Sequence, residues 1–349
     1  MKKITTLSMM LFCSINFIIA QTTRTVDNSN GAGAQYSELQ LAIDEAGTND
    51  TLYVHASEIN YGDVIINKPL TLIGFTHSSE DKNTLVNDIE LVEGASGTRI
   101  SGIRVTDDLF VDSVNQLTDL IFENNYVEDA IAFFGGGASD VLIRGCVVEY
   151  IGTFSTATSS AGCNFTNTLI TNNIVNDAIV TLFPESVTIR NNVFLGANVD
   201  NYEADNFNQV VQNCVFLVRS NSGTELDINV DGVFYDNCLV FNVFETGTAA
   251  PLNGTDNITN EDPLFVSAPE FVSFDFAFNA QLDDYNLQVG SPAIGTGAGG
   301  VDIGLYDNIN FVFNNFGLTP GVPIVNITDI TDQVAPGAMV EVTIESSSN

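Results

Sequence analysis

The sequence predicts an all-β fold in which short parallel strands stack into a solenoid, and three observations support this. A short phrase of apolar residues, a turn pair and two more apolar residues recurs along the chain. The copies are irregularly spaced, and their apolar runs are too short for helices. The turn pair is rich in asparagine, which tolerates the left-handed backbone of a tight bend.

The repeat is clearest in residues 168–175 (TLITNNIV) and 187–194 (VTIRNNVF). A period in the twenties with irregular insertions is typical of stacked units that bury their apolar faces against one another. Leucine-rich repeats share this period, but the chain lacks their leucine scaffold. We therefore expect one coil per copy, with about 4.8 Å between coils. The first position of the turn pair falls at residues 101, 124, 145, 172, 191, 213 and 237.

The second position of the turn pair predicts a ladder of stacked side chains inside the solenoid. Stacked amides can donate to one another along such a column. Cys214 and Cys238 lie on adjacent coils at a distance compatible with a disulfide, but in-register side chains point the same way, so we expect free thiols. The residues at this position are Asn125, Cys146, Asn173, Asn192, Cys214 and Cys238.

The two ends of the solenoid need covers. Ser37 and Gln40 read as a capping box that starts a short helix, and Gly47 follows it. Such a helix would cover the first coil with one apolar face, made of Leu39, Ala42, Ile43 and Ala46. At the other end, residues 324–327 and 339–344 alternate as two strands. We expect residues 317–349 to form a β-hairpin that packs on the last coil or begins an incomplete sandwich module.

The first 20 residues read as a signal peptide, because Lys2 and Lys3 precede an apolar run that ends at Ala20. We therefore expect the protein to be secreted or held at the cell surface. No later run approaches the roughly 20 apolar residues that a spanning helix needs.

Residues 36–54 and the following stretch 65–74 (IINKPLTLIG), together with the asparagine repeat, resemble the pectate-lyase-like right-handed parallel β-helix superfamily, of the secreted kind common in Bacteroidetes. The resemblance covers residues 25–310 and implies a right-handed β-helix domain over residues 21–316. Coils would fill residues 50–245, with loops at 150–166, 196–208 and 245–262. Residues 262–307 resemble closing coils, in which Asp302 would be a structural turn residue. The superfamily includes lyases, hydrolases, epimerases, adhesins and inert scaffolds, so the fold does not specify an activity.

The chain is strongly acidic, with ten Lys and Arg residues against 44 Asp and Glu, a net charge of −34. Loss of Lys2 and Lys3 with the leader would leave eight basic residues, and 44 − 8 gives 36 negative charges. Such a surface repels nucleic acid, anionic lipid and anionic polysaccharide. The charge serves either solubility in salt or the recruitment of divalent cations.

Candidate catalytic residues come from two places. The column before the turn pair reads Glu123, Arg144, Thr171, Arg190, Gln212 and Asp236, which puts Arg144 and Arg190 on one face, about 10 Å apart. His77 and Lys82 cluster with Glu80 and Asp81 in an early loop. Lyases of this superfamily neutralise a uronate carboxylate, often with Ca²⁺, and withdraw a C–H proton with Lys or Arg. The resemblance therefore implies Arg144, Arg190, Lys82 and His77 as the alternative catalytic set.

Acidic pairs and clusters suggest two other chemistries. Glycoside hydrolysis needs paired carboxylates, and Asp107–Asp108 and Asp283–Asp284 are such pairs, but the Gly-His-Gly and Arg-Ile-Lys phrases of related hydrolases are missing. The loop with Asp200, Glu203 and Asp205 is either a calcium site or a solvated acidic loop, and it lacks EF-hand spacing.

We expect a non-catalytic scaffold or binding module without a cofactor, which contacts polysaccharide or a cell-surface protein. The alternative is a polysaccharide lyase that cleaves uronate-containing glycans by β-elimination, with Ca²⁺ as its cofactor.

Overall fold

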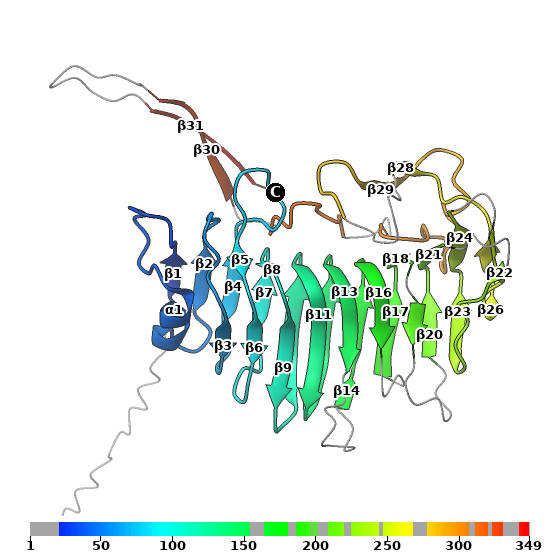
Figure 1. The fold of residues 1–349 in the computed structure, drawn as a ribbon, viewed down its shortest axis with the longest axis horizontal. Coiled ribbons are helices and arrows are strands. Elements are labelled where there is room, and N and C mark those ends of the chain that lie inside the picture. Colours follow the sequence, from blue (N-terminus) through cyan, green and yellow to red (C-terminus); the bar gives the residue numbers. More distant parts are fainter. Residues whose placement is uncertain are drawn as a thin grey trace, which may run out of the picture.

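The computed structural model describes residues 21–153, 164–180, 186–196, 198–200, 209–219, 225–243, 247–267, 278–306, 311–319, 323–330 and 342–348. Its centre is a solenoid of parallel strands in two large sheets. Figure 1 shows the successive coils side by side, from β1 at one end to β26 at the other. The predicted all-β parallel solenoid is confirmed.

The first sheet runs from one end of the solenoid to the other. In stacking order it contains β1 (Thr23–Val26), β2 (Thr51–Val54), β4 (Thr71–Gly74), β7 (Arg99–Ser101), β10 (Leu117–Glu123), β12 (Gly137–Arg144), β15 (Thr168–Thr171), β17 (Val187–Arg190), β20 (Gln209–Gln212), β23 (Val233–Asp236) and β26 (Gly254–Thr255), with β14 (Asn164–Thr166) beside β12.

The second sheet stacks in the same direction. It contains β3 (Val64–Ile66), β6 (Ile89–Leu91), β9 (Leu109–Ser113), β11 (Tyr126–Gly135), β13 (Val147–Thr153), β16 (Ile174–Val180), β18 (Val193–Leu195), β21 (Val215–Val218), β24 (Leu239–Asn242) and β27 (Ile258–Thr259), joined by β5 (Leu85–Val86), β8 (Arg104–Val105) and β19 (Asn198–Asp200). Three two-stranded sheets lie outside the two large ones: β22 (Glu225–Leu226) with β25 (Thr248–Ala249), β28 (Phe265–Ser267) with β29 (Asp284–Leu287), and β30 (Pro323–Ile330) with β31 (Val342–Ser348).

A corner of left-handed residues joins each strand of the first sheet to the second. Its members are Gly102, Asn124, Gly145, Asn172, Asn191, Asn213 and Asn237, with φ between 52° and 74°. We call this row the asparagine corner. The predicted copy at residue 101 is off by one, because Ser101 pairs with Glu123 and so Gly102 aligns with Asn124.

The residues that follow the corner form the predicted internal ladder. The Asn192 Oδ1 accepts the backbone N–H of Asn173 at 2.9 Å, and its Nδ2 donates to the carbonyl of Ile170 at 3.1 Å. Amide-to-amide contact is seen between Asn173 and Asn192, so the amides bond mostly to backbone and less to one another than we expected. Cys146, Cys214 and Cys238 are buried free thiols, as predicted.

Helix α1 (Leu39–Glu45) covers the first coil with Leu39, Ala42 and Ile43. The predicted capping box is wrong: Glu38 is the N-cap and makes no side-chain cap bond. The side-chain amide of Gln40 instead bonds to the backbone of Ile65. Its Oε1 accepts the N–H of Ile65 at 2.7 Å and its Nε2 donates to the carbonyl at 3.2 Å, as the backbone of a neighbouring strand would do. The carboxyl end of α1 is capped by Lys68, whose Nζ donates to three of its last carbonyls.

The solenoid is one coil longer than expected. Residues 245–262, expected as a loop, contain β25, β26 and β27, and the last two pair in register with β23 and β24. Asn257 continues the ladder by accepting the N–H of Cys238 at 2.9 Å.

The chain then reverses instead of adding the closing coils that we expected after residue 262. Residues 261–267, 278–306 and 311–319, here called the return segment, cross the asparagine corner in reverse order (Figure 1). The corner amides hold it: Asn237 donates to the carbonyl of Thr296, Asn191 to Gly304 and Asn172 to Leu305. Further on, the carbonyl of Phe316 accepts the N–H of His77 at 3.0 Å.

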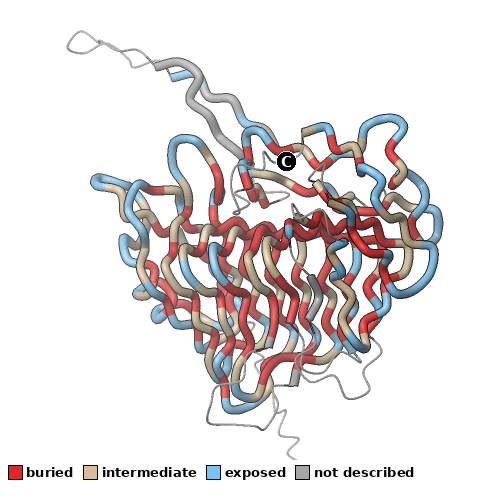
Figure 2. The backbone as a smooth tube through the Cα atoms, turned by 45° about the vertical axis from the view of Figure 1, so that its right-hand side comes forward, coloured by how far each residue is buried: buried red, intermediate tan, exposed pale blue. Residues whose placement is uncertain are grey.

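Two apolar cores result. The first fills the inside of the solenoid. The second lies between the return segment and the outer side of the second sheet, and it includes Val147, Val193, Leu217 and the return-segment residues Phe265 and Phe313. Figure 2 shows buried backbone both within the coils and beneath the return segment.

The C-terminal hairpin β30–β31 is confirmed, but it does not lie on the last coil. Figure 1 shows it leaving the molecule near β5, toward the end where the chain begins. The hydrogen bond between Thr319 and Ser101, at 2.8 Å, fixes that exit point. No helix of the described residues is long and apolar enough to cross a membrane. The predicted signal peptide, residues 1–20, lies outside the described residues.

Candidate binding groove

The candidate site lies on the outer face of the first sheet, next to the asparagine corner. The predicted column of outward residues is confirmed in register: Arg144 pairs with Thr171, Thr171 with Arg190 and Arg190 with Gln212. Arg144 and Arg190 are therefore two coils apart on one face, about 10 Å at the usual strand spacing.

A largely apolar row, interrupted by Thr188 opposite Leu169, runs beside this column. Leu142 and Leu169 pair with each other, and further along the face Val210 and Phe234 are 43% and 44% exposed. Strand residues that alternate between inside and outside explain why each outward column is a continuous stripe.

The return segment supplies the second wall. Together they enclose a groove of about 330 Å³, which we call the sheet groove. Its described lining from the first sheet includes the two arginines, Leu142, Leu169, Thr171 and Gln212, and its lining from the return segment is Ala298, Val301 and Phe311.

At the Arg144 end of the sheet groove, the charged side chains are already paired with one another. Glu123 is 5% exposed and accepts hydrogen bonds from Arg99 and Arg144, the latter at 2.6 Å. Burial raises the pKa of Glu123, but the two guanidiniums outweigh burial and hold the pKa below its usual value. The Arg144 guanidinium also stacks on the Phe311 ring, 4.9 Å from its centroid.

Arg190 is different. It is exposed, and among the described residues its guanidinium forms neither an ion pair nor a hydrogen bond. A guanidinium without a charged partner of its own is suited to a carboxylate, which it can hold with two hydrogen bonds.

The two residues of the second predicted cluster differ in their surroundings. His77 is fully buried, its Nδ1 lies 2.7 Å from the Ser78 hydroxyl, and burial lowers its pKa to about 3. Lys82 is 45% exposed and lies 3.9 Å from Glu58. The return segment thus seals His77 from solvent, whereas the side chain of Lys82 is exposed.

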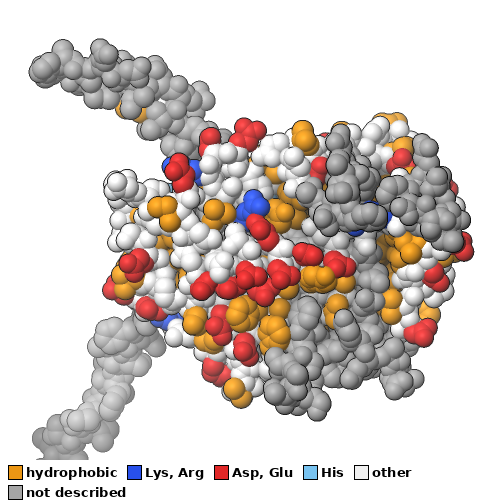
Figure 3. Space-filling view, viewed as in Figure 1, with side chains coloured by type: hydrophobic (Ala, Val, Ile, Leu, Met, Phe, Trp, Pro, Cys, Tyr) orange, Lys and Arg blue, Asp and Glu red, His pale blue; other side chains and the backbone are white. Residues whose placement is uncertain are grey.

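The predicted calcium loop is only partly described. Asp200 ends β19 and its side chain is not described, and Glu203 and Asp205 lie outside the described residues. Among the described residues, Asp107, Asp108 and Asp129 bring carboxylate oxygens within 4.8 Å of one another. Burial, then the neighbouring carboxylates, raise the pKa of Asp108 although the N–H of Ala130 opposes this. Figure 3 shows acidic side chains in a band across one face of the molecule.

The two acidic pairs considered for hydrolysis lie away from the sheet groove. Asp107 and Asp108 follow β8 at the edge of the second sheet, and Asp283 is buried beside β29. Asp302 accepts the N–H of Gly295 at 2.8 Å, in keeping with its expected structural role.

Sequence reasoning missed the residues that roof the groove. Ala298 and Val301 belong to residues 262–307, which we expected to form closing coils, and Phe311 follows that stretch. A signal was present in the second-sheet strands, which are apolar at consecutive positions, as in Val215–Val218. Strands that are apolar on both faces need cover on both faces.

The fold places the chain among parallel β-solenoids. A comparison with protein-family models finds no matching family, and a search of curated proteins finds no similar protein.

Proposed function

We propose that the protein is an exported, non-catalytic binding module that holds a carbohydrate chain with isolated carboxylates in the sheet groove. The observation that carries this proposal is Arg190, an exposed cation without an ion pair among the described residues. Apart from Arg144, which is paired with Glu123, the other lining side chains of the groove are apolar or neutral and polar. The resemblance to secreted pectate-lyase-like β-helices and the leader of residues 1–20 support export and a saccharide ligand.

The lining fits a sugar chain better than a protein side chain or a small anion. Leu142, Leu169 and the Phe311 ring offer apolar surface for C–H faces, while Thr171 and Gln212 offer donors and acceptors for hydroxyls. The groove follows the stack of coils, so a chain laid along it meets guanidinium and neutral polar groups in alternation, from Arg144 to Thr171, Arg190 and Gln212.

The charge of the whole chain sets a limit on the ligand. A net charge of −34 repels a polyanion before contact, whereas one local guanidinium still favours a single carboxylate at short range. We therefore expect a glycan in which acidic sugars are spaced by neutral ones.

Binding is favoured over cleavage by the ionisable groups of the groove. Among its described lining residues these are Arg144 and Arg190, and Arg144 is already paired with Glu123. A general base with a pKa near neutrality is not among them.

A uronate lyase is the second candidate, because both predicted arginines line one groove. In that reaction a base removes the proton beside the carboxylate, the C4–O bond breaks, an unsaturated sugar forms and the leaving oxygen takes a proton. Arg190 would have to act as the base, in a deprotonated form that guanidinium groups resist.

Calorimetric titration of the mature chain with oligogalacturonate, partly methyl-esterified oligogalacturonate, oligoalginate and neutral xylohexaose tests the proposal. We expect tightest binding for the partly esterified chain, and about tenfold weaker binding in Arg190→Ala, since a charged hydrogen bond is worth about 1.4 kcal/mol or more. Lys82→Ala removes the same charge outside the groove and is the matched control.

Ultraviolet absorbance of the same mixtures separates the two candidates. A flat trace with binding that depends on Arg190 supports the binding module. A rising signal that Arg190→Ala abolishes and Lys82→Ala leaves intact identifies the lyase. Absence of binding to all four probes, in protein whose circular dichroism is that of a folded β-protein, would refute both.

A further inference from the structure

Beyond the sheet groove, the return segment carries a second hollow of different chemistry. It holds about 600 Å³ and lies between β28–β29 on one side and residues 313–316 on the other. A smaller pocket of about 160 Å³ adjoins it, and Asn286 and Tyr306 line both. We call the two together the outer trough.

We propose that the outer trough is a binding site for a neutral sugar unit, separate from the sheet groove. Three properties of its described lining carry this inference. The lining has exposed apolar and aromatic surface, it has hydrogen-bond donors and acceptors that are not used within the protein, and it has acidic side chains but no lysine or arginine.

The apolar surface is unusual for its exposure. Leu282 is 68% exposed, Val266 51% and Phe316 37%, and all three line the trough together with Tyr306. Aromatic and aliphatic surface at the edge of a polar hollow is where a ligand with C–H faces gains most from leaving water.

The polar groups are partly engaged in ways that leave a complete set for a ligand. Asn286 donates through Nδ2 to Asp284 Oδ1 at 2.7 Å, which leaves its own Oδ1 as an acceptor. Asn314 accepts two backbone N–H groups through Oδ1, which leaves its Nδ2 as a donor. Within the described residues, Asp284 Oδ2 and the Tyr306 hydroxyl also form no hydrogen bond.

Charge decides the class of ligand. Asp283, Asp284 and Asp302 line the trough and would repel an anion. The Tyr306 hydroxyl stays neutral, because burial and then Asp284 raise its pKa to about 12. Hydroxyl groups, which both donate and accept, match carboxylate, amide and phenol partners.

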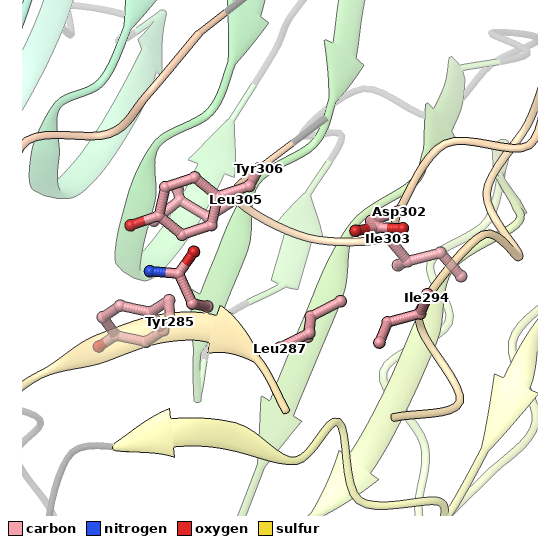
Figure 4. Close-up of a pocket in the computed structure, with 8 residues that line it drawn as sticks. Tyr285, Leu287, Ile294, Asp302, Ile303, Leu305 and Tyr306 are labelled. Carbon is pink, nitrogen blue, oxygen red and sulfur yellow. The ribbon is translucent and has the colours of Figure 1, made fainter. Parts of the chain in front are cut away.

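The trough is held in shape before any ligand arrives. Asn315 donates through Nδ2 to the carbonyls of Ala280 and Asp283, at 3.1 and 2.6 Å, and so ties its two sides together. Figure 4 shows the rings of Tyr285 and Tyr306 at one end of the smaller pocket, with Asp302 and Ile294 at the other. A preformed site loses little entropy when it binds.

Saturation-transfer NMR of the mature chain with cellohexaose, xylohexaose, mannohexaose and laminarihexaose tests the inference, with choline chloride as a cationic probe. We expect transfer to at least one hexaose, and an affinity about tenfold weaker in Tyr306→Ala, as for loss of one aromatic contact. Tyr306→Phe, which keeps the ring, should retain most of the affinity. Val312→Ala, at a 79% exposed position of the same segment outside the trough lining, is the matched control.

The outcomes separate this site from the sheet groove. Loss of hexaose binding in Tyr306→Ala but not in Arg190→Ala or Val312→Ala supports the outer trough. Binding lost in Arg190→Ala alone would assign it to the sheet groove and overturn this inference while leaving the proposed function intact. Transfer to none of the four hexaoses, or Tyr306-dependent transfer to choline alone, would also overturn it.

Discussion

Replacement of Asn192 by alanine tests the ladder as the main polar element of the core. Asn192 is fully buried, and its amide joins two coils through the N–H of Asn173 and the carbonyl of Ile170. Alanine removes the side-chain partner of each of these two buried backbone groups. At about 1–3 kcal/mol for each of the two groups, the expected loss is about 2–6 kcal/mol in the free energy of unfolding.

Cysteine at the same position should be far less costly. At the next coils, Cys214 Sγ accepts the N–H of Asn192 and Cys238 Sγ accepts that of Cys214, each at 3.4 Å. A thiol at position 192 can therefore replace the acceptor, so we expect a loss of about 1–2 kcal/mol, close to the value of one net hydrogen bond.

Urea unfolding followed by far-ultraviolet circular dichroism measures all three proteins, with Thr188→Ala as an exposed control on the same strand. The control should stay within about 0.5 kcal/mol of the wild type. Equal losses for the alanine and cysteine variants, or an alanine variant that loses less than about 1 kcal/mol, would refute the role assigned to the ladder.

Other predictions concern the cover of the solenoid. Because burial depresses the pKa of His77 from 6.5 to about 3, the unfolded chain takes up that proton first, and stability present above pH 6.5 is lost as the pH falls toward 3. Between pH 6.5 and 5 the loss of stability amounts to about 2 kcal/mol, at 1.36 kcal/mol per pH unit. In urea titrations over this pH range, His77→Phe should lack this component of the pH dependence. The same pH dependence in His77→Phe and in the wild type would contradict the assignment to His77. Gly317→Ala should destabilise strongly, since its Cβ would lie 2.0 Å from His77 Cδ2, whereas Gly299, with a similar positive φ and open surroundings, should tolerate alanine at a cost of about 1 kcal/mol; similar melting temperatures would refute the packing argument. Lys68→Met removes the cap of α1 and should cost about 1 kcal/mol by thermal unfolding; no change would mean that water replaces the ammonium group without loss.

Local rules predicted the repeating parts of the molecule. Each residue of the asparagine corner has a left-handed backbone, and the preference of asparagine and glycine for that conformation can be recognised from the residue type alone. In-register stacking then follows, so the alignment of Arg144 with Arg190 could be read from spacing. The extra coil at Asp256–Asn257 could have been found in the same way, since that pair repeats the Asn237–Cys238 pattern.

Contacts between distant parts of the chain were beyond these rules. The capping box failed because Gln40 found a better partner in β3, 25 residues away. His77 looked like a surface histidine in a polar loop, yet its neighbours come from a segment that follows some 240 positions later, as the Thr76–Phe316 hydrogen bond shows. The consecutive apolar residues of β21 indicated that something covers that sheet, but not which segment does so.

The return segment also changes how the coils depend on one another. In a plain solenoid each repeat contacts only its neighbours, so the ends can fray while the middle persists. Here one continuous stretch bonds to Asn237, Asn213, Asn191, Asn172 and Ser101 in turn, and so couples the first coils directly to the last. An array in which each repeat would contact only its neighbours thereby gains contacts between coils that are far apart in the stack. Because these contacts join residues far apart in the sequence, we expect slow folding, and we expect the coils to unfold together rather than one by one.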